Sequence, residues 1–151
     1  MQTPARTQPD LSSLVADVLA NLAFMVSDDP PEQPPAPQNW LYGEVHYQGP
    51  VSGTVACWCT PQFAIQLAAN LLGTDPDTPD AVNAAEDALR ELLNVVGGHL
   101  VTAWYGTSAV FTLSIPSVRK DAPPPQTSDE FCRLYIDGQP LWFCHRAVSA
   151  D

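Results

Sequence analysis

Two carboxylates, a carboxamide and a glycine recur at helical spacing between residues 82 and 100. Asp87, Glu91, Asn94 and Gly98 stand at positions i, i+4, i+7 and i+11, which places them in one nearly straight stripe on an α-helix. The opposite side of the same helix is apolar, so the stripe is expected to face outward. Because Glu91 and Asn94 are three residues apart, their side chains can enter one pocket of a partner together.

The stripe lacks the parts of a catalytic or metal centre of its own. It contains no nucleophile with a base beside it and no two-histidine spacing of metal ligands. By residue type alone, it indicates a polar face that meets solvent or a partner. Gly97 and Gly98 each cost a helix about 1 kcal/mol relative to alanine. The pair indicates either the end of the helix near residue 97 or a smooth patch that another backbone can approach.

The motif Asp87-x-x-x-Glu91-x-x-Asn94, followed 22 positions later by Pro116, resembles the signature of the CheC, CheX and FliY phosphatases of bacterial chemotaxis. The run AEDALRELLNVVGGHL is similar to the active helix of that family, and VFTLSIPSV is similar to the strand that ends at the family's proline. The first predicted helix lacks the Glu-x-x-Asn element. A single copy of the motif favours a CheX-like domain over a CheC-like chain with two copies.

The resemblance implies a phosphatase that acts on a CheY-like receiver domain phosphorylated on aspartate. Asn94 would hold a water in line with the phosphorus, since an amide both donates and accepts hydrogen bonds and carries no charge. Glu91 would pair with the lysine in the receiver's pocket. The other motif positions would be partner contacts at Asp87, Gly97 and Gly98, and a structural proline that ends the neighbouring strand, Pro116.

The resemblance also implies that the chain needs no cofactor and holds no metal, because the magnesium ion belongs to the receiver. A homodimer through the sheet is possible by the same similarity. A non-catalytic module that docks a receiver or a flagellar-switch component with the same helix is the alternative. His99, where family members often carry a small or amide residue, favours binding alone, whereas the presence of both Glu91 and Asn94 favours catalysis.

The elements around this helix predict an α+β domain, in which a mostly antiparallel sheet carries a long active helix and further helices. Apolar periodicity predicts helices over 11–26, 61–72 and 78–104. Runs rich in β-branched and aromatic residues predict two strands within 41–60, one over 110–115 and a hairpin over 131–147 that turns at Asp137-Gly138.

Length and charge limit the classes of protein that this chain can represent. Its 151 residues suit a single CheX-like domain over 11–148, after a flexible N-terminal tail over 1–10. The formal net charge of −11 argues against nucleic acid or an anionic membrane as the partner. No apolar run reaches the roughly 18 residues of a membrane span, and the polar first ten residues lack a secretory signal. We therefore expect a cytoplasmic protein.

Four cysteines leave a metal–thiolate domain open as a second alternative. Cys57 and Cys59 alternate on a predicted strand, so both thiols point to one face. Cys132 and Cys144 flank the Asp137-Gly138 turn and are expected to be cross-strand neighbours. Four thiolates bind zinc, whereas free cysteines are also common as small buried residues.

Overall fold

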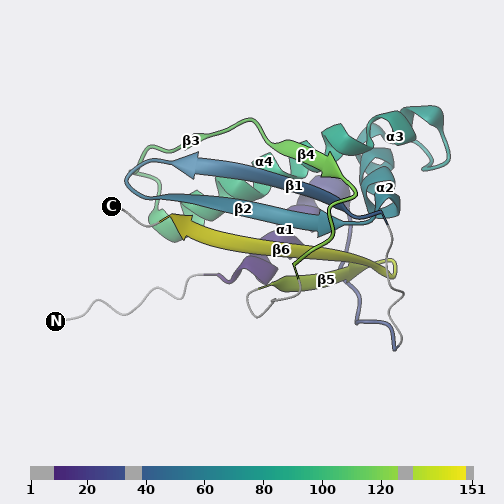
Figure 1. Ribbon diagram of the computed structural model, residues 1–151, viewed down its shortest axis with the longest axis horizontal. Coiled ribbons are helices and arrows are strands. Elements are labelled where there is room, and N and C mark those ends of the chain that lie inside the picture. The colour runs from purple at the N-terminus through teal and green to yellow at the C-terminus, as the bar shows by residue number, and fades with distance from the viewer. Residues whose placement is uncertain (1–8, 33–38, 126–130, 149–151) are drawn as a thin grey trace.

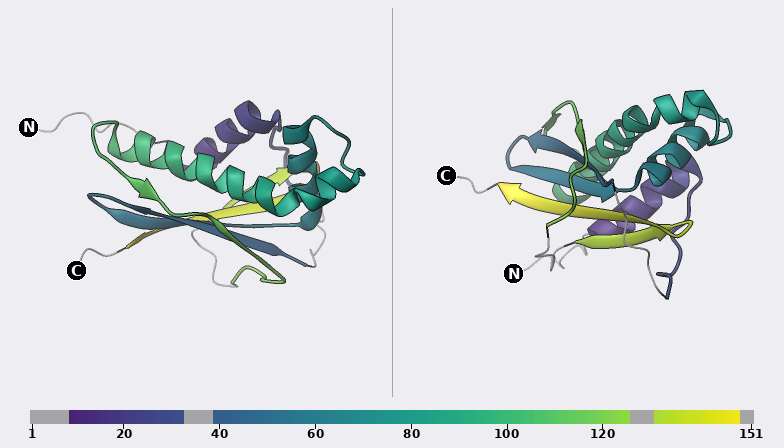
Figure 2. Two further views of the ribbon diagram at one scale, coloured as in Figure 1. Left: turned by 90° about the horizontal axis from the view of Figure 1, so that it is seen from above. Right: turned by 45° about the vertical axis from the view of Figure 1, so that its right-hand side comes forward.

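In the computed structural model, a six-stranded antiparallel sheet carries α1, α2 and α4 on one face (Figure 1; Figure 2, left). The structure describes residues 9–32, 39–125 and 131–148. Most of the predicted tail, 1–10, lies outside them. The elements are α1 (Leu11–Ala23), β1 (Leu41–Gln48), β2 (Ser52–Cys59), α2 (Pro61–Leu72), α3 (Pro79–Asn83), α4 (Ala85–Tyr105), β3 (Thr112–Leu113), β4 (Ser117–Lys120), β5 (Cys132–Ile136) and β6 (Gln139–Val148). The predicted α+β class is confirmed.

Two long hairpins form the body of the sheet, whose strand order is β3-β1-β2-β6-β5, with β4 also paired to β1. The second hairpin turns at Asp137 and Gly138, whose φ values of 51° and 78° are those a two-residue hairpin turn requires. The predicted turn is therefore confirmed. Among the described residues, no helix is both long and apolar enough to cross a membrane.

The sheet edge beside β1 consists of two short strands, β3 and β4. A single strand over 110–115, ended by Pro116, was predicted. Tyr47 of β1 pairs with Leu113 of β3, and Glu44 pairs with Ser117 of β4. Four steps along the edge therefore face three steps along β1, which is a β-bulge of one extra residue. Pro116 lies in this bulge, where a residue without an N–H is tolerated, and pairing with β1 resumes after it.

The long helix predicted over 78–104 is divided in two. Ala84, with φ −93° and ψ 2°, separates α3 from α4, and its side chain cannot cap the helix that follows. Glu86 and Asp87 lie in the first turn of α4, where negative charge interacts favourably with the helix N-terminus. Asp87 of the motif therefore also helps to stabilise the N-terminus of α4.

The first helix is also shorter than predicted. It ends at Ala23 because Phe24 adopts a left-handed conformation with φ 57°. The N–H of Met25 then bonds to the carbonyl oxygen of Leu19 at 3.1 Å, which closes the C-terminal turn three residues earlier than the apolar pattern suggests.

Glycines allow α4 to lie close to β1. A Cβ atom on Gly43 of β1 would come within 2.6 Å of Cδ1 of Leu93, so a larger residue there would force the leucine or the helix to move. On the helix side, a Cβ atom on Gly97 would lie 3.3 Å from Cγ1 of Val45. The two glycines therefore set how deeply α4 sits on the sheet.

A buried tyrosine joins β1, α4 and β6. The hydroxyl of Tyr47 lies 2.7 Å from Nε2 of His145 and 3.1 Å from the hydroxyl of Tyr105. The Tyr47 and His145 rings stack with an interplanar angle of 7°. Burial disfavours the charged forms, so it lowers the pKa of His145 and raises the pKa of Tyr47.

We expect the free energy of unfolding to fall in acid partly through His145. Its pKa is lower in the folded chain than its ordinary value of 6.5, so below about pH 6.5 the unfolded chain binds a proton more readily and gains stability relative to the fold. His145→Gln should reduce the loss measured by urea unfolding between about pH 7.5 and 5.5. His99→Gln, at an exposed helical histidine, is the control; equal pH slopes in both variants would contradict the assignment.

Candidate functional site

The solvent side of α4 carries the stripe that the spacing predicted. Asp87, Glu91 and Asn94 are all exposed on this helix. The opposite side is fully buried in the core at Leu89, Leu92, Leu93, Val96 and Leu100. The apolar face therefore fixes the rotation of α4 about its axis, and the polar side chains project away from the domain.

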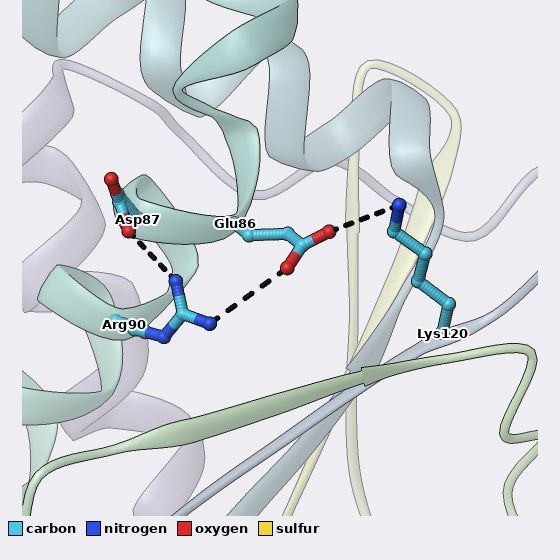
Figure 3. A network of polar contacts seen from close by, with 4 residues as sticks. All are labelled: Glu86, Asp87, Arg90 and Lys120. Atoms are coloured by element: carbon cyan, nitrogen blue, oxygen red, sulfur yellow. Dashed lines mark hydrogen bonds and ion pairs between the residues drawn. The ribbon is translucent and has the colours of Figure 1, made fainter.

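A network of charged side chains ties the first turn of α4 to β4 (Figure 3). Arg90 donates from Nη1 to Oδ1 of Asp87 at 2.7 Å, and its Nη2 lies 3.8 Å from Oε1 of Glu86. The other carboxylate oxygen of Glu86 lies 3.4 Å from Nζ of Lys120. Exposed pairs of this kind are each worth only about 0–1 kcal/mol, so their main effect here is to orient the side chains at this end of the helix.

Glu91 and Asn94 stand outside this network. In the part of the chain that the structure describes, neither side chain makes a hydrogen bond or an ion pair. The nearest cation in the sequence, Arg90, is engaged by the two preceding acids. Glu91 therefore presents an unneutralised carboxylate to solvent beside an uncommitted amide, and both remain available to a partner.

The two glycines of the motif have different surroundings. Gly97 is buried against Val45 and Leu113, whereas Gly98 is half-buried and a Cβ atom there would meet only Leu113, at 3.9 Å. The helix continues to Tyr105, so the interpretation of the pair as a helix end is wrong. Gly97 serves the packing of α4 on the sheet, and Gly98 is the one beside the exposed stripe.

The segment after α4 doubles back along the helix through β3 to β4 (Figure 2, left). Leu113 lies next to Gly97 and Gly98, and the carbonyl oxygen of Ser117 lies next to Gly43, beneath Leu93. Residues 114–116 therefore run beside the turn of α4 that carries Asn94.

Sequence reasoning missed that apolar side chains in this segment are exposed. Ile115 is 88% exposed and Val110 is 82% exposed, although the run VFTLSI was predicted to be a single apolar strand. The adjacent Pro116 was the available signal, because proline within a strand pattern marks an edge or a bulge.

An open groove of about 800 Å³ adjoins the stripe at the N-terminal end of α4. Its apolar wall includes Leu41, Ile65 and Val82, and its polar wall includes Arg90 and Lys120. Arg90 and Lys120 belong to the ion-pair network of Figure 3, whereas Asp121, which also lines the groove, does not. The groove is thus continuous with the stripe, and its two cations are already paired with Glu86 and Asp87.

The cysteines do not converge. Cys57 and Cys59 lie in the core between sheet and helices, whereas Cys144 lies on the outer face beside Trp58. The prediction that Cys132 opposes Cys144 is wrong, because Cys132 pairs with Phe143.

One ion cannot reach all four thiols from these positions, so the geometry opposes the metal–thiolate alternative. No group of three or more His, Cys, Asp or Glu residues within the described ranges is placed to hold a metal ion. Burial raises the pKa of Cys57 to about 12, which keeps this thiol protonated at neutral pH.

Comparison with known proteins places these features in context. The family model described as "Chemotaxis phosphatase CheX" matches residues 41–135. No curated protein matches the sequence. One similar solved structure is the chemotaxis protein CheX from Desulfovibrio desulfuricans, with 18% identity, a TM-score of 0.67, and coverage of 91% of this chain and 96% of that one.

Two further solved structures share the fold. The CheX–CheY–BeF3–Mg2+ complex from Borrelia burgdorferi matches with 16% identity and a TM-score of 0.63, covering 92% of this chain and 96% of that chain. Thermotoga maritima FliY matches with 13% identity and a TM-score of 0.55, covering 93% of this chain and 85% of that one. At these identities the likeness establishes the fold.

Replacing Gly98 by alanine should raise the free energy of unfolding by up to about 1 kcal/mol, because alanine favours a helix interior and the new Cβ atom would make only an ordinary contact. Gly97→Ala is the matched control and should gain less or lose stability, since its Cβ atom would press on Val45. Urea unfolding of both variants measures the difference. A destabilised Gly98→Ala protein would contradict the open surroundings described for this residue.

Proposed function

The chain belongs to the CheX family of chemotaxis phosphatases, and we propose that it hydrolyses the aspartyl phosphate of a CheY-like receiver domain through Glu91 and Asn94. The observation that carries this proposal is the joint projection of these two side chains from α4, with no partner among the described residues. A protein that used them only for its own stability would engage them in contacts like those of Glu86 and Asp87.

The choice of a receiver as substrate is supported by a relative of the same fold. The CheX protein of Borrelia burgdorferi has been solved in a complex with CheY, BeF3 and Mg2+. Beryllium fluoride bound to a carboxylate has the shape and charge of a phosphoryl group, so that complex resembles the phosphorylated state. We infer that the face of α4 that carries Glu91 and Asn94 meets a receiver in the present chain.

Asn94 acts by placing water. Hydrolysis forms a bond from the water oxygen to phosphorus and breaks the bond from phosphorus to the aspartyl oxygen, which releases inorganic phosphate and the free carboxylate. The Asn94 amide oxygen accepts a hydrogen bond from the water. This contact points a lone pair of the water oxygen at the phosphorus. An amide is not a base at neutral pH, so the acceleration comes from position, which is the main contribution available in phosphoryl transfer.

Glu91 acts by holding the receiver. Its carboxylate forms a charge-assisted contact with the lysine of the receiver's pocket, and docking removes water from this pair and strengthens it. Because Arg90 is already engaged by Glu86 and Asp87, the incoming lysine does not have to displace an internal partner. The pair fixes the receiver so that Asn94 meets the phosphoryl group.

The remaining motif residues support this contact. We place Asp87 and Gly98 at the rim of the docking surface, where the glycine lets the receiver backbone approach α4 and the aspartate orients Arg90. Magnesium stays with the receiver, and this chain supplies no cofactor. We also propose a cytoplasmic location and a homodimer that forms through the sheet.

Removing the amide should remove most of the catalytic effect. We expect Asn94→Ala to reduce the acceleration of receiver dephosphorylation about 100-fold, and Glu91→Ala to act mainly by raising KM. The measurement is the lifetime of phosphate on purified receivers from the same genome, with and without the protein. Asp17→Ala combined with Asn21→Ala removes an exposed acid and an exposed asparagine from α1 and is the matched control.

Two outcomes would oppose the proposal. If the wild type and the Glu91→Ala, Asn94→Ala double variant give the same phosphate lifetime, these residues do not catalyse. The second outcome is that the wild type binds a beryllium fluoride-loaded receiver without shortening the phosphate lifetime of the phosphorylated receiver. In that case the chain is the non-catalytic docking module.

A further inference from the structure

The β-bulge in the edge strand is a feature that hydrolysis by Glu91 and Asn94 does not explain. It lies between the pairs Tyr47–Leu113 and Glu44–Ser117. Bulges in edge strands near functional sites redirect a side chain or end strand pairing. Because pairing with β1 resumes at Ser117, this bulge does not end the strand. Its effect is to redirect the side chains of residues 114–116.

Specific hydrogen bonds hold the bulge in one conformation. The N–H of Ser114 donates to the carbonyl oxygen of His46 at 2.8 Å, and the N–H of His46 donates to the hydroxyl of Ser114 at 3.0 Å. The serine hydroxyl thus replaces a backbone acceptor in the interrupted ladder, and Pro116 has no N–H to satisfy. The segment is therefore a fixed part of the sheet edge.

The residue that the bulge turns outward is Ile115. Leu113 and Val118, on either side of the bulge, pack against the core, whereas Ile115 is 88% exposed. Its position between Leu113 and Ser117 places it beside the turn of α4 that carries Asn94. A rigidly presented aliphatic side chain, on a segment that runs beside the turn with the uncommitted amide, is suited to bury against the same partner.

We propose that Ile115 is an apolar docking contact for the receiver, resting on an apolar side chain at the rim of its acyl-phosphate pocket. This inference rests on the proposed function and names a residue that determines affinity rather than the chemical step. It makes the docking surface continuous from Glu91 and Asn94 on α4 across to the edge strand.

The charge of the chain favours such a contact. With a net charge of −11, the protein gains little long-range attraction toward a receiver pocket that itself contains carboxylates. Burial of an aliphatic side chain adds affinity that needs no opposite charge. It also adds affinity that salt does not screen.

One exposed apolar side chain that lacks this setting is Val26. This residue is 73% exposed and lies near the opposite edge of the sheet, where Asp28 forms a single bridge to Tyr135 of β5. It is a matched control, because it offers similar aliphatic surface far from α4's exposed stripe.

Binding of beryllium fluoride-loaded receivers from the same genome tests the inference. We expect Ile115→Ala to raise Kd about tenfold while kcat at saturating phosphorylated receiver stays within about twofold of wild type. Ile115→Leu should restore most of the affinity, and Val26→Ala should bind as wild type. Circular dichroism and urea unfolding of each variant confirm that the exposed substitution leaves the fold intact.

The outcomes separate this inference from the function on which it rests. If Ile115→Ala binds as tightly as wild type while Asn94→Ala abolishes hydrolysis, the docking contact is overturned and the phosphatase stands. If Ile115→Ala weakens binding while the Asn94 variant hydrolyses normally, the docking contact stands and the catalytic assignment falls. If no receiver binds the wild type, both are overturned.

Discussion

The depth at which α4 rests on β1 is the constraint on which the rest of the site depends. Gly43 lies under Leu93, and Gly97 lies against Val45, so the helix axis approaches the sheet more closely than side chains at these positions would allow. The close approach lowers the helix toward the edge strand. The exposed turn of α4 and the bulge at residues 114–116 consequently border one surface, although they are separated along the chain.

Selective neutralisation of charge adds a second constraint. The chain has only six lysines and arginines against 17 acids. Arg90 and Lys120 nevertheless gather around Glu86 and Asp87 at one end of α4. One turn further along, Glu91 forms no ion pair with any residue that the structure describes. The first turn of α4 thus pairs its own charges, whereas the next turn leaves its polar groups uncommitted. The boundary falls between Arg90 and Glu91.

The sequence was most informative where a period of 3.6 residues or a strong local turn decided the structure. The stripe on α4 follows from the spacing of its leucines and valines, and the hairpin follows from Asp137-Gly138. The sequence was uninformative where a shift of one residue changes the pairing register of two strands. Cys144 was expected to oppose Cys132, but the hairpin is centred between Asp137 and Gly138, so Cys132 pairs with Phe143 and Cys144 faces the other side of the sheet.

The bulge and the break at Ala84 show the same limit in another form. Neither Ser114 nor Ala84 has a propensity that requires an interruption. The bulge is instead set by hydrogen bonds to His46 on β1, and the break at Ala84 shows only in its backbone angles, φ −93° and ψ 2°. Local sequence can mark such a site, as Pro116 does, but the direction in which Ile115 turns depends on a strand about seventy residues away in sequence.

Positional catalysis explains why these constraints matter together. An amide that only orients water needs a backbone that does not move when the partner arrives. Asn94 lies in the interior of a 21-residue helix, and the neighbouring residues Leu93 and Val96 are fully buried. Its backbone is therefore already fixed before docking, and only its side chain must be ordered. A motif of few residues can serve such chemistry because the packing beneath the helix supplies the precision that the motif itself does not encode.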